Sequence, residues 1–365
     1  MKSGRTLVEL ATEVQRQAAS KKDALVQTQS LAVNTNGQSL LWLGGAEPFG
    51  LTNLAHRQMG DHLGIPAKWY DTMQGRIEDW KLPDGSNLFD TTVNTLLKAR
   101  PANEQRLVRT LDGNARAFLS NKYKPIDNLP VLMSILPVLQ DMKGLDWAKA
   151  SLEVTDNKMY LQLVNRDLTA LITGKHNFID EVAAGIVISN SEVGLGAFRI
   201  QPMMWRLVCE NGLIRTIESK VKYHVGGVMG TDGEAYSWLG DDTIQARSEA
   251  TVLEMRDAVR AALDGDLFQN SVDAANAAAG VKMQGDPIAA VQWVTDKFNF
   301  NADEQAATLR NLIEGSDLSL WGMVNAVTAT ANTVESYDRA VELETMGGKL
   351  LDLPKHEVTA LVNAN

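Results

Sequence analysis

The sequence contains few of the residues that crosslink a chain or hold a metal. Its 365 residues include one cysteine and five histidines. Cys209 cannot form an intramolecular disulfide, and a single cysteine excludes a cysteine-cluster zinc site. His56 and His62 are six residues apart, whereas ligand pairs on one helix face are three or four apart. We therefore expect no metal site and no cofactor.

Long apolar segments are also missing. No stretch approaches the ~20 apolar residues that a membrane-spanning helix needs. The first residues, MKSGRTLVELATEVQRQAASKKD, lack the apolar core of a secretory signal. Hydrophobic residues make up 44% of the chain and charged residues 22%, which are ordinary globular values. We expect a folded cytoplasmic protein with no membrane partner.

The negative charge of the chain is unevenly distributed. The formal net charge is −10, which by itself argues against a nucleic-acid-binding protein. Residues 1–228 hold 26 Lys and Arg against 23 Asp and Glu, whereas residues 229–365 hold 9 against 22. The acidity therefore belongs to the C-terminal part, and the first part has to be judged by itself.

The spacing of apolar and turn-forming residues predicts an α+β fold. The first thirty residues have helical spacing. Two pairs of strand-like runs are joined by turn residues: 106–111 with 115–120 across Asp112-Gly113-Asn114, and 151–154 with 159–164 across Asp156-Asn157. Such turns favour hairpins because glycine and asparagine tolerate a positive φ. Further strand-like residues over 183–215 include Asn211-Gly212, which predicts another hairpin turn.

We expect an antiparallel or mixed sheet built from hairpins with packed helices, followed by a mostly helical C-terminal part. Helical spacing is clear over 242–263 and 287–298. The predicted divisions are an N-terminal helix and lead-in (1–50), a β-rich α+β core with basic, aromatic-bearing strands (51–228), and an acidic, mostly helical part (229–365).

Three stretches carry a family resemblance: Arg206–Gly212 with the following Tyr223-His224, Trp321–Thr328, and Arg339–Leu351 with its Gly347-Gly348-Lys349 step. They resemble, in order, motifs of the phage- and plasmid-like family called domain of unknown function 932, over about residues 50–355. The resemblance implies a setting on phages, prophages or plasmids, so a phage-encoded chain would work in the cytoplasm of a bacterial host. It carries over no catalytic residue.

Basic and aromatic residues are interleaved in the strand-like region. Residues 98–124 hold seven Lys and Arg against two acidic residues, and residues 199–224 hold five against two. Proteins that bind single-stranded nucleic acid contact the phosphate backbone with Lys and Arg side chains and provide aromatic side chains on which the bases stack. The candidate nucleic-acid-binding residues are Arg106, Arg109, Arg116, Lys122, Tyr123, Lys124, Arg199, Arg206, Lys220 and Lys222. The same alternation is also typical of a half-exposed strand whose charges are solvated.

No catalytic residue stands out. Cys209 follows the apolar Leu207-Val208, which is typical of a buried small side chain and not of a nucleophile. The glycine-rich segments do not match GxxxxGK[ST] or GxGxxG. We therefore expect a non-enzymatic protein.

Three functions remain open. The leading hypothesis is an accessory protein of phage or plasmid DNA metabolism that binds single-stranded DNA and assists annealing or recombination. Its acidic C-terminal part would serve self-association into a homo-oligomer or docking onto a replication protein. The second is an interaction protein that acts on a host system such as defence, with Trp293 and Trp321 as candidate contacts. The helical spacing of apolar and small residues around Trp321 favours a role in core packing instead. The third is a metal-dependent enzyme acting on nucleic acid.

Overall fold

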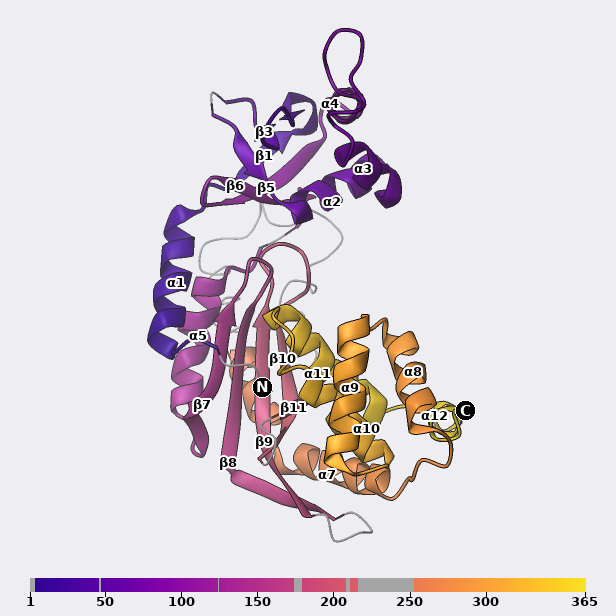
Figure 1. Ribbon diagram of the computed structural model, residues 1–365. Helices are drawn as coiled ribbons and strands as arrows, with labels where there is room; N and C mark the ends of the chain where they lie inside the picture. The colour runs from indigo at the N-terminus through magenta and orange to yellow at the C-terminus, as the bar shows by residue number, and fades with distance from the viewer. Residues whose placement is uncertain (1–3, 46, 124, 174–178, 208–210, 216–252) are drawn as a thin grey trace. The chain divides into compact units, whose positions relative to one another are not determined.

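The computed structural model describes residues 4–365 apart from 46, 124, 174–178, 208–210 and 216–252 (Figure 1). Its contacts divide the chain into two compact units. The small unit consists of Thr12–Pro125 and Ser191–Gly196, and the large unit of Met1–Ala11, Ile126–Asn190 and Ala197–Asn365. The first division falls inside helix α1 (Leu7–Ser20).

These units do not follow the expected divisions. No division falls after residue 50, because strands from both sides of that position pair in one sheet of the small unit. The expected division after residue 228 lies outside the described residues.

The small unit contains a mixed six-stranded sheet with the order β1-β5-β6-β4-β3-β2. Its strands are β1 (Ala24–Gln27), β2 (Ala32–Asn34), β3 (Leu40–Trp42), β4 (Phe49–Leu51), β5 (Gln105–Leu111) and β6 (Asn114–Ser120). β4 pairs with β6 in parallel, and the other pairs are antiparallel. The predicted β5–β6 hairpin is confirmed: Asp112 and Gly113 turn the chain with φ values of 50° and 77°.

Helices η1 (Thr28–Ser30), α2 (Asn53–Leu63), α3 (Ala67–Gln74) and α4 (Leu88–Lys98) complete the small unit. The Thr52 hydroxyl accepts a hydrogen bond from the Ala55 amide and caps α2, and Gly64 ends that helix in the left-handed conformation. The buried side chains Met59, Phe89 and Phe118 bring α2, α4 and the sheet into one core.

The large unit contains an antiparallel five-stranded sheet with the order β11-β10-β9-β8-β7. Helix α5 (Asn128–Gln140) precedes β7 (Leu145–Val154), β8 (Met159–Thr173), β9 (Ile179–Asn190), β10 (Arg199–Arg206) and β11 (Asn211–Ile214). The hairpin predicted from residues 151–164 is confirmed by the pairing of β7 with β8.

The turn predicted at Asn211-Gly212 is wrong. Both residues lie in β11, where Asn211 pairs with Arg206 and Gly212 with Trp205. Glycine is needed there for close packing and not for a turn. A Cβ on Gly212 would lie 3.0 Å from the Met203 sulfur and 3.2 Å from a Glu344 carboxyl oxygen.

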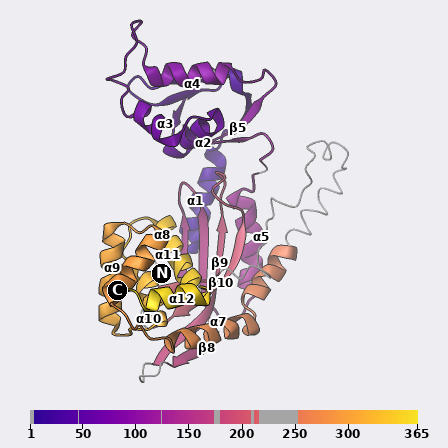
Figure 2. The ribbon, with the colours of Figure 1, turned by 90° about the vertical axis from the view of Figure 1, so that its right-hand side faces the viewer.

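Helices α7–α12 gather beside this sheet (Figures 1 and 2). They are α7 (Gly265–Ala279), α8 (Pro287–Phe298), α9 (Ala302–Gly315), α10 (Leu320–Thr330), α11 (Tyr337–Leu351) and α12 (Lys355–Val362), and residues 253–262 are helical too. Five of them begin at a side chain that accepts a backbone N–H: Asp264, Asp286, Asn301, Ser319 and Ser336.

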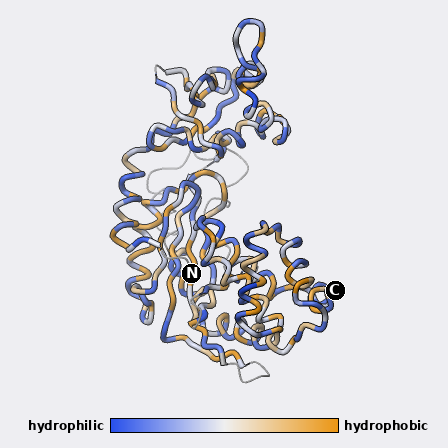
Figure 3. The backbone as a smooth tube through the Cα atoms, viewed as in Figure 1, coloured by the Kyte–Doolittle hydropathy of each residue, from blue (hydrophilic) through white to orange (hydrophobic). Residues whose placement is uncertain are grey.

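Sheet and helices of the large unit share their core. Val182 and Ala184 of β9 belong to the core cluster that also contains side chains of α7, α8 and α10. The intervening Ala183 belongs to the cluster with Trp205, as the two-residue period of a strand requires. Along the C-terminal helices, hydrophobic and hydrophilic residues alternate with one another (Figure 3), as in helices that bury one face. The expected fold class, sheet with helices followed by a mostly helical part, is confirmed.

Membrane-spanning helices are not found in the part of the chain that the structure describes. None of its helices combines the necessary length with sufficient hydrophobicity.

Candidate functional site

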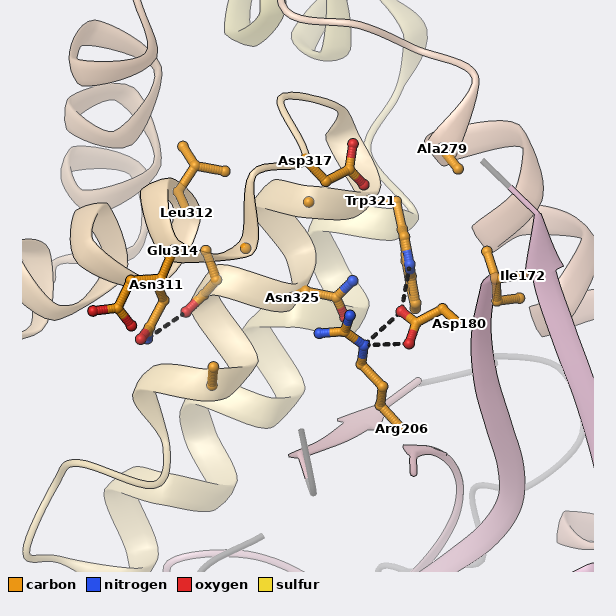
Figure 4. Close-up of a pocket in the computed structure, with 14 residues that line it drawn as sticks. Ile172, Asp180, Arg206, Ala279, Asn311, Leu312, Glu314, Asp317, Trp321 and Asn325 are labelled. Carbon is orange, nitrogen blue, oxygen red and sulfur yellow. Dashed lines mark hydrogen bonds and ion pairs between the residues drawn. The ribbon is translucent and has the colours of Figure 1, made fainter. Parts of the chain in front are cut away.

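A pocket of about 220 Å³ lies within the large unit between the sheet and helices α9 and α10 (Figure 4). Asp180 of β9 and Arg206 of β10 line it from the sheet, and Asn311, Trp321 and Asn325 line it from the helices. Its volume is below the ~300–1,000 Å³ typical of pockets for drug-sized ligands. The pocket therefore suits a small molecule or one part of a larger molecule.

An ion pair that is held in place from two sides forms one wall. The Arg206 Nε donates to Asp180 Oδ1 at 2.6 Å, and the indole Nε1 of Trp321 donates to Asp180 Oδ2 at 3.2 Å. The Asp180 side chain is buried, so its charge has to be matched within the protein. Asp180 lies in strand β9 and Trp321 in helix α10, so the guanidinium of Arg206 is held in place before any ligand binds.

Small residues on one face of α10 leave room for the pocket. Gly322, Ala326 and Ala329 follow one another at helical spacing along its lining. The Ser319 hydroxyl accepts from the Gly322 amide and also donates to Asp317 Oδ2 at 2.9 Å, so the loop before the helix is closely packed on its first turn.

Gly322→Ala is expected to destabilise the large unit by about 2 kcal/mol, because overpacked sites cost ~1–3 kcal/mol. The added Cβ would lie 1.7 Å from the Asp317 carbonyl oxygen, so the backbone has to shift. Urea denaturation measures the change. Gly315→Ala is the control, because the pocket residue Gly315 has open space around its Cβ position. Equal effects of the two variants would contradict the packing argument.

Three polar side chains of the pocket keep hydrogen-bonding capacity for a ligand. The Asn311 Nδ2 donates to the Ala326 carbonyl at 3.2 Å and to Thr330 Oγ1 at 3.1 Å, which leaves the Asn311 Oδ1 as an acceptor. Among the described residues, no hydrogen bond occupies the Asn325 amide or the exposed Glu314 carboxylate. Besides the guanidinium of Arg206, the pocket thus offers one amide donor and several acceptors.

The stretches that carry the family resemblance meet in the large unit. Arg206, Trp321 and Asn325 line the pocket. Beside it, the buried Asn211 Nδ2 donates to Thr328 Oγ1, and Glu344 of the third stretch accepts from the Gln162 Nε2 at 2.7 Å. Burial raises the pKa of Glu344 to about 7, while its hydrogen bonds with Gln162 and the Gly212 backbone oppose that rise.

Gly347 and Gly348 let the third stretch approach the sheet closely. A Cβ on Gly347 would lie 2.3 Å from the Thr328 methyl group, and one on Gly348 would lie 2.1 Å from the Ile214 carbonyl oxygen. The Gly347-Gly348-Lys349 step therefore lies inside helix α11 as a packing feature.

Two of the predicted nucleic-acid-binding residues of the small unit are buried in ion pairs. The Arg109 guanidinium contacts Asp23 Oδ2 at 2.7 Å and donates to the Glu192 carbonyl. The Arg116 Nη2 donates to Glu192 Oε2 at 2.5 Å. Neither cation faces solvent, so in this structure neither one is placed to contact a phosphate.

The other predicted residues are dispersed. Arg106 is half-buried with its guanidinium 5.0 Å from the Phe118 ring centre, and the Tyr123 hydroxyl donates to the Ser191 carbonyl. Lys122 of the small unit and Arg199 of the large unit are exposed, whereas Arg206 lines the pocket. Lys124, Lys220 and Lys222 lie outside the described residues.

The histidines of helix α2 have structural partners. Buried His56 joins Ser39 and Tyr70 through its two ring nitrogens at 2.6 and 2.8 Å, and burial lowers its pKa to about 4. His62 Nε2 contacts Glu104 Oε1 at 2.7 Å. No group of three metal-ligating side chains occurs among the described residues. Cys209, His176 and His224 lie outside them.

An antiparallel sheet, a helical layer and a pocket with a fixed Arg206–Asp180 pair characterise the large unit of this α+β protein. The chain belongs to the family described as Domain of unknown function (DUF932), whose model matches residues 116–346. The match confirms the family resemblance and includes every residue of the pocket. No curated protein and no solved structure matches the chain.

Several pocket residues could not be identified from the sequence. The burial of Trp321 agrees with the core role that its helical spacing favours, but its indole hydrogen bond to Asp180 could not be foreseen. Asp180 and Asn311 lie outside the stretches that carry the family resemblance, and strand order and helix packing bring them to the pocket. The sequence feature that could have indicated pocket residues was the family resemblance, because its stretches include Arg206, Trp321 and Asn325.

Proposed function

We propose that the chain is a non-enzymatic binding protein whose large unit takes a small polar molecule in the pocket. The observation that supports this is the Arg206–Asp180 pair, fixed by Trp321 in front of a cavity with free amide and carboxylate groups. A side chain that is already ordered loses little entropy on binding. Such an arrangement serves recognition.

Filling the pocket tests this function. Ala329→Phe places a ring in the lining of the cavity, and Ala306→Phe places the same ring on the exposed side of α9 as the control. A screen of nucleosides, amino acids and sugars by thermal shift should find a ligand that stabilises the wild type and the control by about 2.7 kcal/mol at a hundredfold excess over Kd. The filled variant should lose this effect. A ligand that stabilises both variants equally would contradict the proposed site.

Single-stranded DNA binding is a second candidate, with assistance of annealing or recombination in phage or plasmid DNA metabolism as its context. The exposure of Lys122 and Arg199 favours it, because these two predicted cations are accessible to phosphates.

Fluorescence anisotropy with a long oligonucleotide at low and moderate salt tests this candidate. Lys122→Ala and Arg199→Ala should each weaken binding and reduce its salt dependence. If micromolar protein shows no salt-dependent binding, the candidate fails.

A further inference from the structure

The hydrogen-bonding balance of the pocket points to a ligand with donor groups. Asn311 Oδ1 and the Glu314 carboxylate can only accept, and the Asn325 amide can accept and donate side by side. A ligand that matches them carries an N–H donor next to a single acceptor. Sugars and phosphates, whose oxygens are mainly acceptors or hydroxyls, match this set less well.

The charges around the pocket favour a ligand without negative charge. Asp180 is paired with Arg206, and Asp317 Oδ1 contacts the Lys282 ammonium at 3.1 Å. Glu314 is exposed and has no ion pair among the described residues. The unbalanced charge at the pocket is therefore negative and repels a phosphate or carboxylate.

The remaining walls are apolar. Ile172, Ala279 and Leu312 are buried side chains that line the pocket from β8, α7 and α9. Figure 4 shows Ile172 and Ala279 on the side of the pocket opposite Asn311 and Leu312. A flat ring with apolar faces and a polar edge can contact such walls while its edge bonds to the amides.

We infer that the pocket binds a nucleobase that carries an exocyclic amino group, as in adenosine or cytidine, and this inference rests on the proposed function. The amino group and the adjacent ring nitrogen present a donor beside an acceptor. A carboxamide such as that of Asn325 pairs with this edge through two hydrogen bonds. The base can come from a free nucleoside or from an unpaired position in a strand.

Matched nucleosides test the inference by isothermal titration calorimetry. Adenosine should bind at least about tenfold more tightly than inosine, because the carbonyl and N7 of inosine present two acceptors where the amino group and N7 of adenosine present a donor and an acceptor. Asn325→Leu, which keeps the side-chain size, should reduce this ratio to about one. AMP should bind more weakly than adenosine, and Glu314→Gln should narrow that difference. The melting temperature of each variant without ligand establishes that it folds.

The outcomes separate the two proposals. Equal binding of adenosine and inosine, or discrimination that persists in Asn325→Leu, would overturn the nucleobase inference, while loss of binding in Ala329→Phe would still support the pocket. Nucleoside binding that is unchanged in Ala329→Phe would overturn the pocket itself. An oligo-dA strand that competes with adenosine identifies an unpaired base as the source, whereas adenosine binding without such competition identifies a free nucleoside.

Discussion

Glu192→Ala is expected to lower the free energy of unfolding of the small unit by about 3–5 kcal/mol. Glu192 is 2% exposed, and its carboxylate contacts the Lys21 ammonium and the Arg116 guanidinium, each at 2.5 Å. The Lys21 and Arg116 side chains are themselves only 10% and 7% exposed. Removing the carboxylate leaves two cations in a low-dielectric site, and the cost of an uncompensated buried charge dominates the effect.

Urea denaturation, with hydrogen exchange of the β5 and β6 amides to assign the effect to the small unit, measures this loss. Glu78→Ala is the matched control in the same unit. Glu78 pairs with Lys81 at 2.8 Å, but their side chains are 77% and 53% exposed, so its removal should change stability by less than ~1 kcal/mol. A similar small change for Glu192→Ala would show that the buried pairs do not stabilise this unit.

The same ion pairs explain why the predicted interface differs from the structure. Strand periodicity indicates that Arg109 and Arg116 lie in a hairpin, but it cannot identify their partners. Arg116 is 76 residues from Glu192 in sequence, and Arg109 is 86 residues from Asp23. The segment 191–196, which holds Glu192, belongs to the small unit although strands β9 and β10 on either side belong to the large unit. Such pairing depends on chain topology and not on local pattern.

Rules that consider only neighbouring residues predicted the fold correctly where the conformation of those residues alone decides the structure. Asp112-Gly113 forms the predicted hairpin turn because both residues adopt a positive φ. Asn211-Gly212 carries the same turn signal, yet there the missing Cβ serves contact with Met203 and Glu344. Glycine has two uses, and the sequence alone does not distinguish them.

The pocket shows the corresponding limit for function. Arg206 was selected because it is cationic, but Asp180, 26 residues away, converts it from a free charge into a fixed hydrogen-bonding group. The small residues of α10 that leave the cavity open read in the sequence as ordinary helix core. A cavity forms where packed elements leave space unfilled, and the residue types along the sequence do not reveal such space. The family motifs therefore indicated more of the pocket residues than the chemical type of each residue did.

The stability of the large unit is expected to fall by about 3 kcal/mol between pH 5 and pH 9 through Glu344 alone. Burial raises the pKa of Glu344 in the folded chain to about 7, above its usual value of 4.5. The folded state therefore holds the proton more tightly than the unfolded state. The resulting stabilisation is complete below about pH 4.5 and is lost as the pH rises through 7.

Glu344→Gln should remove this dependence, because the amide is neutral at every pH and can still accept from Gln162 Nε2. We expect the variant to resemble the wild type near pH 5 and to exceed it by about 3 kcal/mol at pH 9, as measured by urea denaturation at both values. Glu342→Gln on the same helix is the control, because that side chain is 53% exposed and should leave the pH profile unchanged. A wild type that is equally stable at pH 5 and pH 9, with no gain from Glu344→Gln, would mean that the folded chain accommodates the Glu344 charge.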